Sequence, residues 1–253
     1  MRRVLLPAAG LGALVALWAA WVAVFDPAPY LLPSPLAVAE ALGDARPVLS
    51  DHVRATVQVA LLGLAVAAAV GVAVAVALWR WSALRQAAYP LLIASQSVPS
   101  VVLAPVFVTW FGFGLLPRVL VVALVGFFPV AVAVTDGLLA APRPLGALVT
   151  SMGAGRWRRL LLVDGPSALP SFFSGLTVAA SYAVFGAIVA EWMGATEGLG
   201  VFINRSRESF RTDRLLAAVV VIAAVSLVLV AAVRALARTA TPWADVERAE
   251  AAR

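Results

Sequence analysis

The residues best suited to specific contacts lie in one short basic stretch of a strongly apolar chain. Between Met152 and Pro170 the sequence is Met-Gly-Ala-Gly-Arg-Trp-Arg-Arg-Leu-Leu-Leu-Val-Asp-Gly-Pro-Ser-Ala-Leu-Pro, which places three arginines around one tryptophan. Tryptophan and arginine are enriched in protein-binding hot spots. The same composition also suits a hairpin lying on the lipid headgroups of a membrane surface. The stretch therefore predicts a contact surface, for either a protein partner or lipid headgroups.

The chain lacks residues that several catalytic and metal-binding classes require. It has no lysine, so it cannot form the glycine-rich phosphate loop that ends in Lys-Ser/Thr. It has no cysteine, and its single histidine is His52, which we expect at a solvated or headgroup-level flank. We therefore expect no catalytic residue, no metal site and no cofactor bound by this chain. The net charge of +6 comes from arginines that flank apolar runs, which indicates a membrane protein more than a nucleic-acid binder.

The composition indicates an all-α, polytopic membrane helix bundle. Hydrophobic residues make up 63% of the chain and charged residues 13%, against about 25% charged in soluble domains. Uncharged runs of about 18 residues or more predict transmembrane helices. Six are expected, over residues 4–25, 53–79, 86–116, 119–139, 167–190 and 215–233.

Two of these six segments are irregular. The first could be a signal peptide, but its apolar run is longer than the roughly 7–15 residues of a signal core, so we expect a retained helix. The third is broken by Pro90, Pro99 and Pro105, and the carbonyl groups that they free need other partners. Between the first two segments, residues 26–51 form a polar connection, with a short amphipathic helix expected over 36–42.

The distribution of arginines predicts the orientation. More arginines fall on segments that share a side with the N-terminus than on the opposite side, which places both termini and the loop 142–166 in the cytoplasm. We divide the chain into a first helix with its periplasmic connection (1–52), a transmembrane core (53–236) and a cytoplasmic tail (237–253).

The loop 142–166 itself predicts two short helices. Prolines 142 and 144 suit a helix start, and an apolar face follows at Leu145, Leu148, Val149 and Met152. Gly153 and Gly155 then break the helix. A second short helix is expected over 156–163, ending before Pro166.

The order of several short motifs resembles that of permeases of binding-protein-dependent ABC importers. Met152-Gly-Ala-Gly-Arg-Trp, followed by Ser-Ala-Leu-Pro ending at Pro170, is similar to the EAA loop of that family (Leu-Gly-Ala-Ser-x-Trp, then Leu-Pro-Ala-Ala-Leu-Pro). Further motifs resemble the nitrate/sulfonate/taurine branch, which also contains transporters of thiamine-pyrimidine precursors. They are Leu32-Pro-Ser-Pro, Ala104-Pro, Trp110-Phe-Gly-Phe-Gly, Phe127-Phe-Pro, Ala190-Glu-Trp-Met-Gly-Ala, Gly198-Leu-Gly and Arg211-Thr-Asp.

The resemblance implies a cytoplasmic coupling helix between the fourth and fifth transmembrane helices. This helix would dock on a separate ABC ATPase subunit, which binds the ATP. The matching positions here are Gly153, Ala154, Arg156, Trp157 and Pro170. The resemblance also implies a second permease subunit, most simply a homodimer, and a periplasmic or lipid-anchored solute-binding protein. It further implies that the chain lies in the plasma or inner membrane of a bacterial cell. The sequence departs from the family where the motif opens, because Ala147 replaces the usual acidic residue.

Five polar residues are candidates for lining a translocation pathway: Gln96, Ser97, Ser181, Tyr182 and Glu191. Each has a plainer alternative. The first four could form hydrogen bonds between helices, and Glu191 could cap the end of its helix at the interface.

An ion-coupled secondary transporter is the competing class. Such proteins place carboxylates or histidines inside their membrane helices as relays, whereas Asp136 and Glu191 lie near helix ends here. A membrane enzyme has no supporting residue cluster. The sequence does not define the solute: an alkanesulfonate-like anion and a pyrimidine precursor both fit the resemblance.

Overall fold

The computed structural model describes residues 2–95 and 100–243, and every regular element in it is a helix. In chain order these are α1 (Arg2–Phe25), α2 (Pro35–Asp44), α3 (Arg46–Arg80), α4 (Ser82–Ser95), η1 (Ser100–Leu103), α5 (Ala104–Phe111), α6 (Leu115–Leu139), α7 (Arg143–Ser151), α8 (Arg156–Arg159), η2 (Leu160–Asp164), α9 (Gly165–Glu191), α10 (Leu199–Glu208) and α11 (Thr212–Ala240). Four helical stretches of the described chain are long and apolar enough to cross a membrane: α3, α6, α11 and the continuous stretch Arg156–Glu191.

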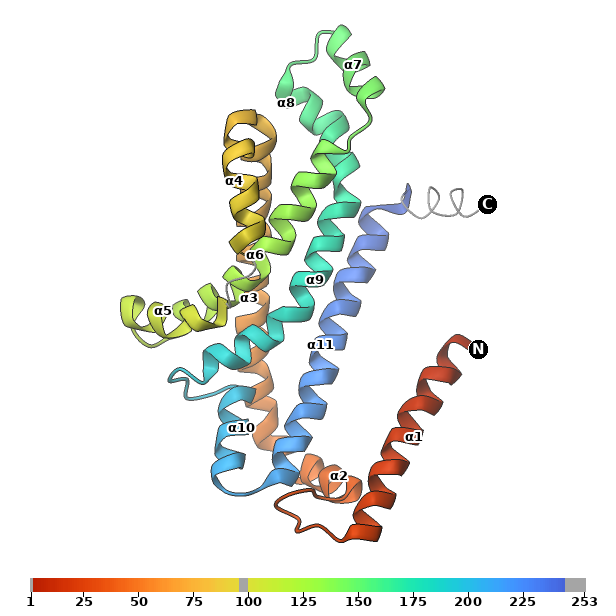
Figure 1. Cartoon of the computed structure of the whole chain (residues 1–253), viewed down its shortest axis with the longest axis vertical. Helices are drawn as coiled ribbons and strands as arrows, with labels where there is room; N and C mark the ends of the chain where they lie inside the picture. Colours follow the sequence, from red (N-terminus) through yellow and green to blue (C-terminus); the bar gives the residue numbers. More distant parts are fainter. Residues whose placement is uncertain (1, 96–99, 244–253) are drawn as a thin grey trace.

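Helices α3, α6 and α9 form the centre of the bundle, and α11 packs against α9 (Figure 1). Small residues bring the helix backbones close together. A Cβ atom added to Gly63 would lie 2.4 Å from Cβ of Val122, and one added to Gly71 would lie 2.8 Å from Cγ1 of Val130. In lipid, where helix association depends on close packing more than on the hydrophobic effect, such contacts hold the helices together.

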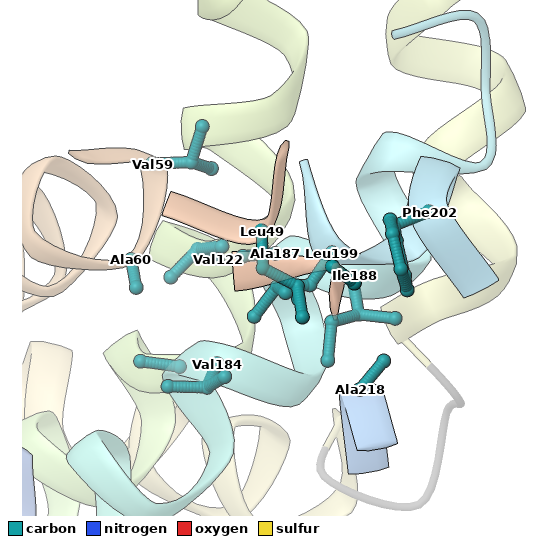
Figure 2. Close-up of a cluster of buried hydrophobic side chains, with 12 residues drawn as sticks. Leu49, Val59, Ala60, Val122, Val184, Ala187, Ile188, Leu199, Phe202 and Ala218 are labelled. Carbon is teal, nitrogen blue, oxygen red and sulfur yellow. The ribbon is translucent and has the colours of Figure 1, made fainter. Parts of the chain in front are cut away.

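The core continues beyond the bundle centre to the end that carries α10. Figure 2 shows Val59 of α3, Val122 of α6 and Val184 of α9 grouped with Leu199 at the start of α10. Leu199 is fully buried, so the start of α10 is part of this core. Helices α2 and α10 lie at this end, and α7 and α8 lie at the opposite end (Figure 1).

Helix α3 begins earlier than the hydropathy predicts. The polar connection ends at Ala45, and Pro47 sits in the first turn of a helix of 35 residues. At 1.5 Å per residue such a helix is about 50 Å long, whereas the hydrocarbon core is about 30 Å thick. Hydropathy marks the apolar part of a helix and not its ends. It therefore predicts residues 46–52, which form the first turns of α3, as part of the polar connection. Helix α2 confirms the predicted short amphipathic helix.

The third predicted transmembrane segment is not one long helix. It is divided into α4, of 14 residues, and α5, of 8 residues, each shorter than the roughly 20 needed to cross the bilayer. Pro90 lies inside α4, and Pro105 lies in the first turn of α5. Figure 1 shows α5 lying across the direction of the long helices. The candidate residues Gln96 and Ser97 fall outside the described residues.

The helix expected over 156–163 does not end before Pro166. It runs from Arg156 to Glu191 without a break, because the π-helical segment η2 joins α8 to α9. The N–H of Gly165 donates to the carbonyl of Leu160, five residues back. Proline is tolerated in the first turn of an α-helix, and Pro166 occupies such a position directly after η2.

Candidate functional site

Residues 143–164, hereafter the hairpin, project from one end of the bundle (Figure 1). Helix α7 ends in a Schellman motif. The N–H of Ala154 donates to the carbonyl of Val149 at 2.9 Å, and the N–H of Gly153 donates to the carbonyl of Thr150 at 3.0 Å. Gly153 has φ of 86°, the left-handed conformation that this motif requires after a helix. The predicted glycine corner is therefore a defined turn.

Three of the four residues predicted to form the apolar face of α7 point out of the molecule. Leu145 is 51% exposed, Leu148 55% and Met152 77%, while Val149 is half-buried. Apolar side chains grouped in this way on a projecting element are typical of a surface that meets a partner. The hairpin therefore presents these three side chains without using them for its own packing, whereas Leu160 at its base belongs to the bundle core.

A buried carboxylate fixes the base of the hairpin. Asp164 is fully buried, and its carboxylate accepts hydrogen bonds from Nε1 of Trp79, at 3.1 Å, and from Nε of Arg159. The nearest atoms of the Arg159–Asp164 ion pair are 3.1 Å apart. The guanidinium of Arg159 also covers Gly146, where an added Cβ would lie 3.0 Å from it. Asp164 thus joins α3, α8 and α7 at one point.

Trp157 packs partly against the bundle and is partly exposed. Its ring centroid is 6.5 Å from that of Trp79, within the usual range for an aromatic pair, yet 59% of the side chain is exposed. One edge of Trp157 therefore contacts α3, and the rest is free to meet a partner.

A second buried polar cluster lies at the other end of α9. The first backbone N–H groups of α10 have no partner inside their own helix. Side chains of α3 and α9 accept from them instead: Nδ1 of His52 from Gly198 at 2.9 Å, Oγ1 of Thr56 from Leu199 at 2.8 Å, and Oε2 of Glu191 from Gly200 at 2.8 Å. Three consecutive N–H groups are satisfied in this way, so α10 is fixed to both long helices.

Glu191 and Thr56 are also joined directly. Oγ1 of Thr56 donates to Oε1 of Glu191 at 2.7 Å, and Glu191 is only 1% exposed. Gly198 packs closely against the carboxylate, since an added Cβ would lie 2.2 Å from its Cδ. The expectation of a solvated flank for His52 is wrong, because His52 is buried and accepts a backbone hydrogen bond.

The remaining candidate residues lie in different places. Ser181 and Tyr182 share one exposed face of α9, with Ser174, Val178 and Phe185. The hydroxyl of Ser181 donates to the carbonyl of Thr177 in its own helix. Glu191 is not on that face. Pro170 lies inside α9, beyond the hairpin, and lines a cavity of about 420 Å³ between α9 and α11.

Local sequence patterns do not predict the roles of Asp164 and Thr56 or the partners of His52. A weak signal was available for one pair, because His52 and Thr56 are four residues apart and so share a helix face. Asp164 gave no such signal. It lies in a segment expected to be a loop, and its partners come from residues 79 and 159.

Comparison with known proteins gives consistent matches. Residues 59–242 match the family described as "Binding-protein-dependent transport system inner membrane component". The formylaminopyrimidine transport permease protein ThiX of Halalkalibacterium halodurans is 36% identical over 85% of this chain and 86% of its own length. The riboflavin transport system permease protein RibX of Chloroflexus aurantiacus is 38% identical over 91% of this chain and 87% of its own length.

Two further matches extend the comparison. The taurine transport system permease protein TauC of Escherichia coli K12 is 30% identical over 96% of this chain and 90% of its own length. A chain from a solved structure of the MetNI methionine ABC transporter, in an inward-facing conformation, shares the fold with a TM-score of 0.68 and 19% identity. The match covers 77% of this chain and 98% of that one.

Proposed function

Because the chain belongs to the binding-protein-dependent transport system inner membrane component family, it is the membrane permease of an ABC importer, and we propose that its hairpin is the coupling element that docks on the ATPase. The observation that carries this proposal is an exposed apolar face on a rigidly mounted hairpin. Leu145, Leu148 and Met152 are exposed, while Asp164 holds the base of the hairpin to α3. A coupling element needs both properties, since a loosely attached hairpin would not transmit a movement.

Docking of the hairpin on the ATPase would define which side of the membrane each end of the molecule faces. The hairpin faces the cytoplasm, and the end with α2 and α10 faces the side from which a solute-binding protein delivers the solute. Figure 1 supports a common side for the termini, since the start of α1 and the end of α11 both point toward the hairpin end. Six crossings follow if α1 and the α4–α5 segment each complete one.

We further propose that two copies of the chain pair along the exposed face of α9 and enclose the pathway there. Serine and tyrosine side chains on that face, Ser181 and Tyr182, would meet the solute. The ATP would be bound by the partner subunit alone. The named solutes of the relatives are formylaminopyrimidine, riboflavin and taurine, and a small organic solute of this range is the proposed cargo.

The two carboxylates named above as relay candidates, Asp136 and Glu191, do not favour an ion-coupled secondary transporter. Asp136 accepts from the phenol of Tyr89 and is exposed, and Glu191 is enclosed by Thr56 and backbone N–H groups. Among the described residues, no chain of hydrogen bonds connects these two carboxylates into the kind of relay that proton-driven transporters use.

The test is co-purification of the chain with its co-expressed ATPase, followed by ATP turnover in nanodiscs. Gly153→Arg and Trp157→Ala should lose the ATPase or uncouple its turnover, whereas the matched control Trp110→Ala, an exposed tryptophan on α5, should retain it. The proposal fails if the wild-type chain never retains an ATPase and proteoliposomes of the chain alone accumulate solute on an ion gradient.

A further inference from the structure

Four arginines surround one cavity between the hairpin and the corner where α3 meets α4. The cavity has a volume of about 300 Å³ and is lined by Trp79, Arg80, Ser82, Arg85, Arg156 and Arg159. These residues come from the consecutive helices α3 and α4 and from α8, which follows much later in the chain and is brought to them by the fold. The hairpin and α3 also meet at the Trp79–Trp157 ring pair, so the cavity lies where the hairpin contacts the bundle.

Most of the positive charge around this cavity is not neutralised within the chain. The described residues form two ion pairs, Arg159–Asp164 and Arg211–Asp213, and only the first involves a residue that lines the cavity. Arg80 lies over the ring of Trp81 at 5.9 Å, which holds the guanidinium in place without cancelling its charge. Arg80, Arg85 and Arg156 therefore face the cavity without an acidic partner in the described chain. Guanidinium groups so close together repel one another unless an anion lies between them.

We propose that this cavity is a binding site for a phosphate-bearing anion, supplied by the headgroup of an anionic phospholipid. The guanidinium of arginine binds two phosphate oxygens at once through two parallel N–H groups. Several guanidinium groups that bind in this bidentate way suit a tetrahedral anion. Trp79 and Trp81 mark the level of the headgroups, because tryptophan is enriched at membrane interfaces. Basic pockets between transmembrane helices on the cytoplasmic side are a recognised way of holding lipid headgroups. The side of the membrane rests on the proposed function.

The site would connect lipid to the hairpin. Arg159 lines the cavity and also holds Asp164, and Arg156 begins the helix that leads into η2. A bound phosphate would therefore fix the hairpin to the α3–α4 corner.

The test uses native mass spectrometry of the full-length chain in detergent, with phosphatidylglycerol or phosphatidylcholine added. We expect phosphatidylglycerol to be retained at least tenfold more than phosphatidylcholine. Arg80→Gln combined with Arg85→Gln should abolish that preference. Arg143→Gln combined with Arg158→Gln, which removes the same charge from exposed hairpin residues outside the cavity, should keep it. Arg80→Lys combined with Arg85→Lys should give an intermediate preference, because lysine keeps the positive charge but cannot form the bidentate hydrogen bonds of a guanidinium.

A second experiment distinguishes a lipid headgroup from free phosphate as the ligand. Millimolar inorganic phosphate, added without lipid, should bind weakly or not at all if the headgroup is the ligand. Phosphate adducts that disappear only in the Arg80/Arg85 variant would assign the same site to a soluble anion. Equal loss of lipid in both double variants would overturn the proposal, because binding would then follow net charge alone.

Co-purification with the ATPase separates this proposal from the proposed function. We expect the Arg80/Arg85 variant to retain the ATPase while losing the lipid preference. If it instead loses the ATPase and keeps its lipid binding unchanged, the arginines bind an acidic surface of the partner protein and the phosphate site is refuted. Size-exclusion profiles that match the wild type show that each variant is folded.

Discussion

The two ends of α9 each carry a buried carboxylate, but the two are held in different ways. At the hairpin end, Asp164 accepts from two side chains, the indole of Trp79 and the guanidinium of Arg159. At the α10 end, Glu191 accepts from the hydroxyl of Thr56 and from the backbone N–H of Gly200. Both carboxylates join α9 to α3, so the same pair of long helices supports a structure at each end.

The difference between these partners suggests that the two ends are held with different strength. The side chain of Arg159 is 39% exposed and can form hydrogen bonds with water, so its contact with Asp164 adds less to stability than a fully buried contact would. The N–H groups at the start of α10 are fixed in the backbone and buried, so they cannot turn toward water. We infer that the hairpin and α10 both move with the bundle as one body, and that α10 is the more strongly held of the two.

Replacement of Glu191 by alanine gives the largest expected effect. It would leave the N–H of Gly200 and the hydroxyl of Thr56 without their acceptor in a buried site, which costs about 3 kcal/mol of unfolding free energy. Thermal unfolding in detergent should show a clear decrease in Tm. The matched control is Glu197→Ala. It removes an exposed carboxylate from the connection between α9 and α10, six residues after Glu191, and should leave Tm nearly unchanged.

Replacement of Asp164 by alanine should cost less, about 2 kcal/mol, because Arg159 can recover water contacts while Trp79 loses its acceptor. The same melting experiment compares the two variants directly. Asp164→Ala should also reduce retention of the ATPase, since the base of the hairpin is loosened. An equal or greater decrease in Tm than for Glu191→Ala would contradict the proposed difference between the two ends.

The apolar face and the turn of the hairpin could be anticipated from the sequence, whereas its anchor Asp164 and the contacts of the α10 end could not. The apolar positions of α7 and the turn at Gly153 follow from local rules, because helix periodicity and the left-handed requirement of a helix end act within a few residues. The contacts of Glu191 with Thr56 join residues 135 positions apart. No local pattern encodes that separation, so a buried capping network appears in the sequence only as scattered polar residues.

The same limit explains the errors in helix boundaries. Hydropathy located the apolar parts of α3, α6, α9 and α11, which are long enough to cross a membrane. It could not show that α3 continues into polar residues, or that the π-helical turn before Pro166 carries one helix from the hairpin into the bundle. Both features depend on backbone hydrogen bonding and packing, and not on composition.

The corner of the hairpin offers a smaller test. Gly153→Ala forces a Cβ atom into a left-handed conformation at φ of 86°, which costs about 1–2 kcal/mol even though the surrounding space is open. Gly155→Ala is the matched control, because φ there is −69° and no atom lies within 4 Å of the added Cβ. Melting curves should separate the two variants, and equal Tm values would show that the Schellman turn does not limit stability.

The smallest expected effect concerns the corresponding corner at the other end of the molecule. Helix α10 also ends in a Schellman motif, with the N–H of Phe210 donating to the carbonyl of Arg207 and the N–H of Arg211 to that of Ser206. Here the left-handed position, with φ of 54°, is held by Phe210 and not by glycine. Since the side chain is 75% exposed, little packing is lost when it is removed.

Phe210→Gly should therefore stabilise the protein by about 0.5–1 kcal/mol, because relief of the left-handed strain exceeds the entropy that glycine adds to the unfolded chain. Phe111→Gly is the control, since Phe111 is a half-exposed aromatic residue in the last turn of α5, where glycine lowers helix stability. The two variants should change Tm in opposite directions. A lower Tm for Phe210→Gly would mean that the phenyl ring makes a stabilising contact beyond the isolated chain, with lipid or with a partner on the α10 side. In that case the two corners would both be contact surfaces, one with a glycine turn and the other with an exposed aromatic ring.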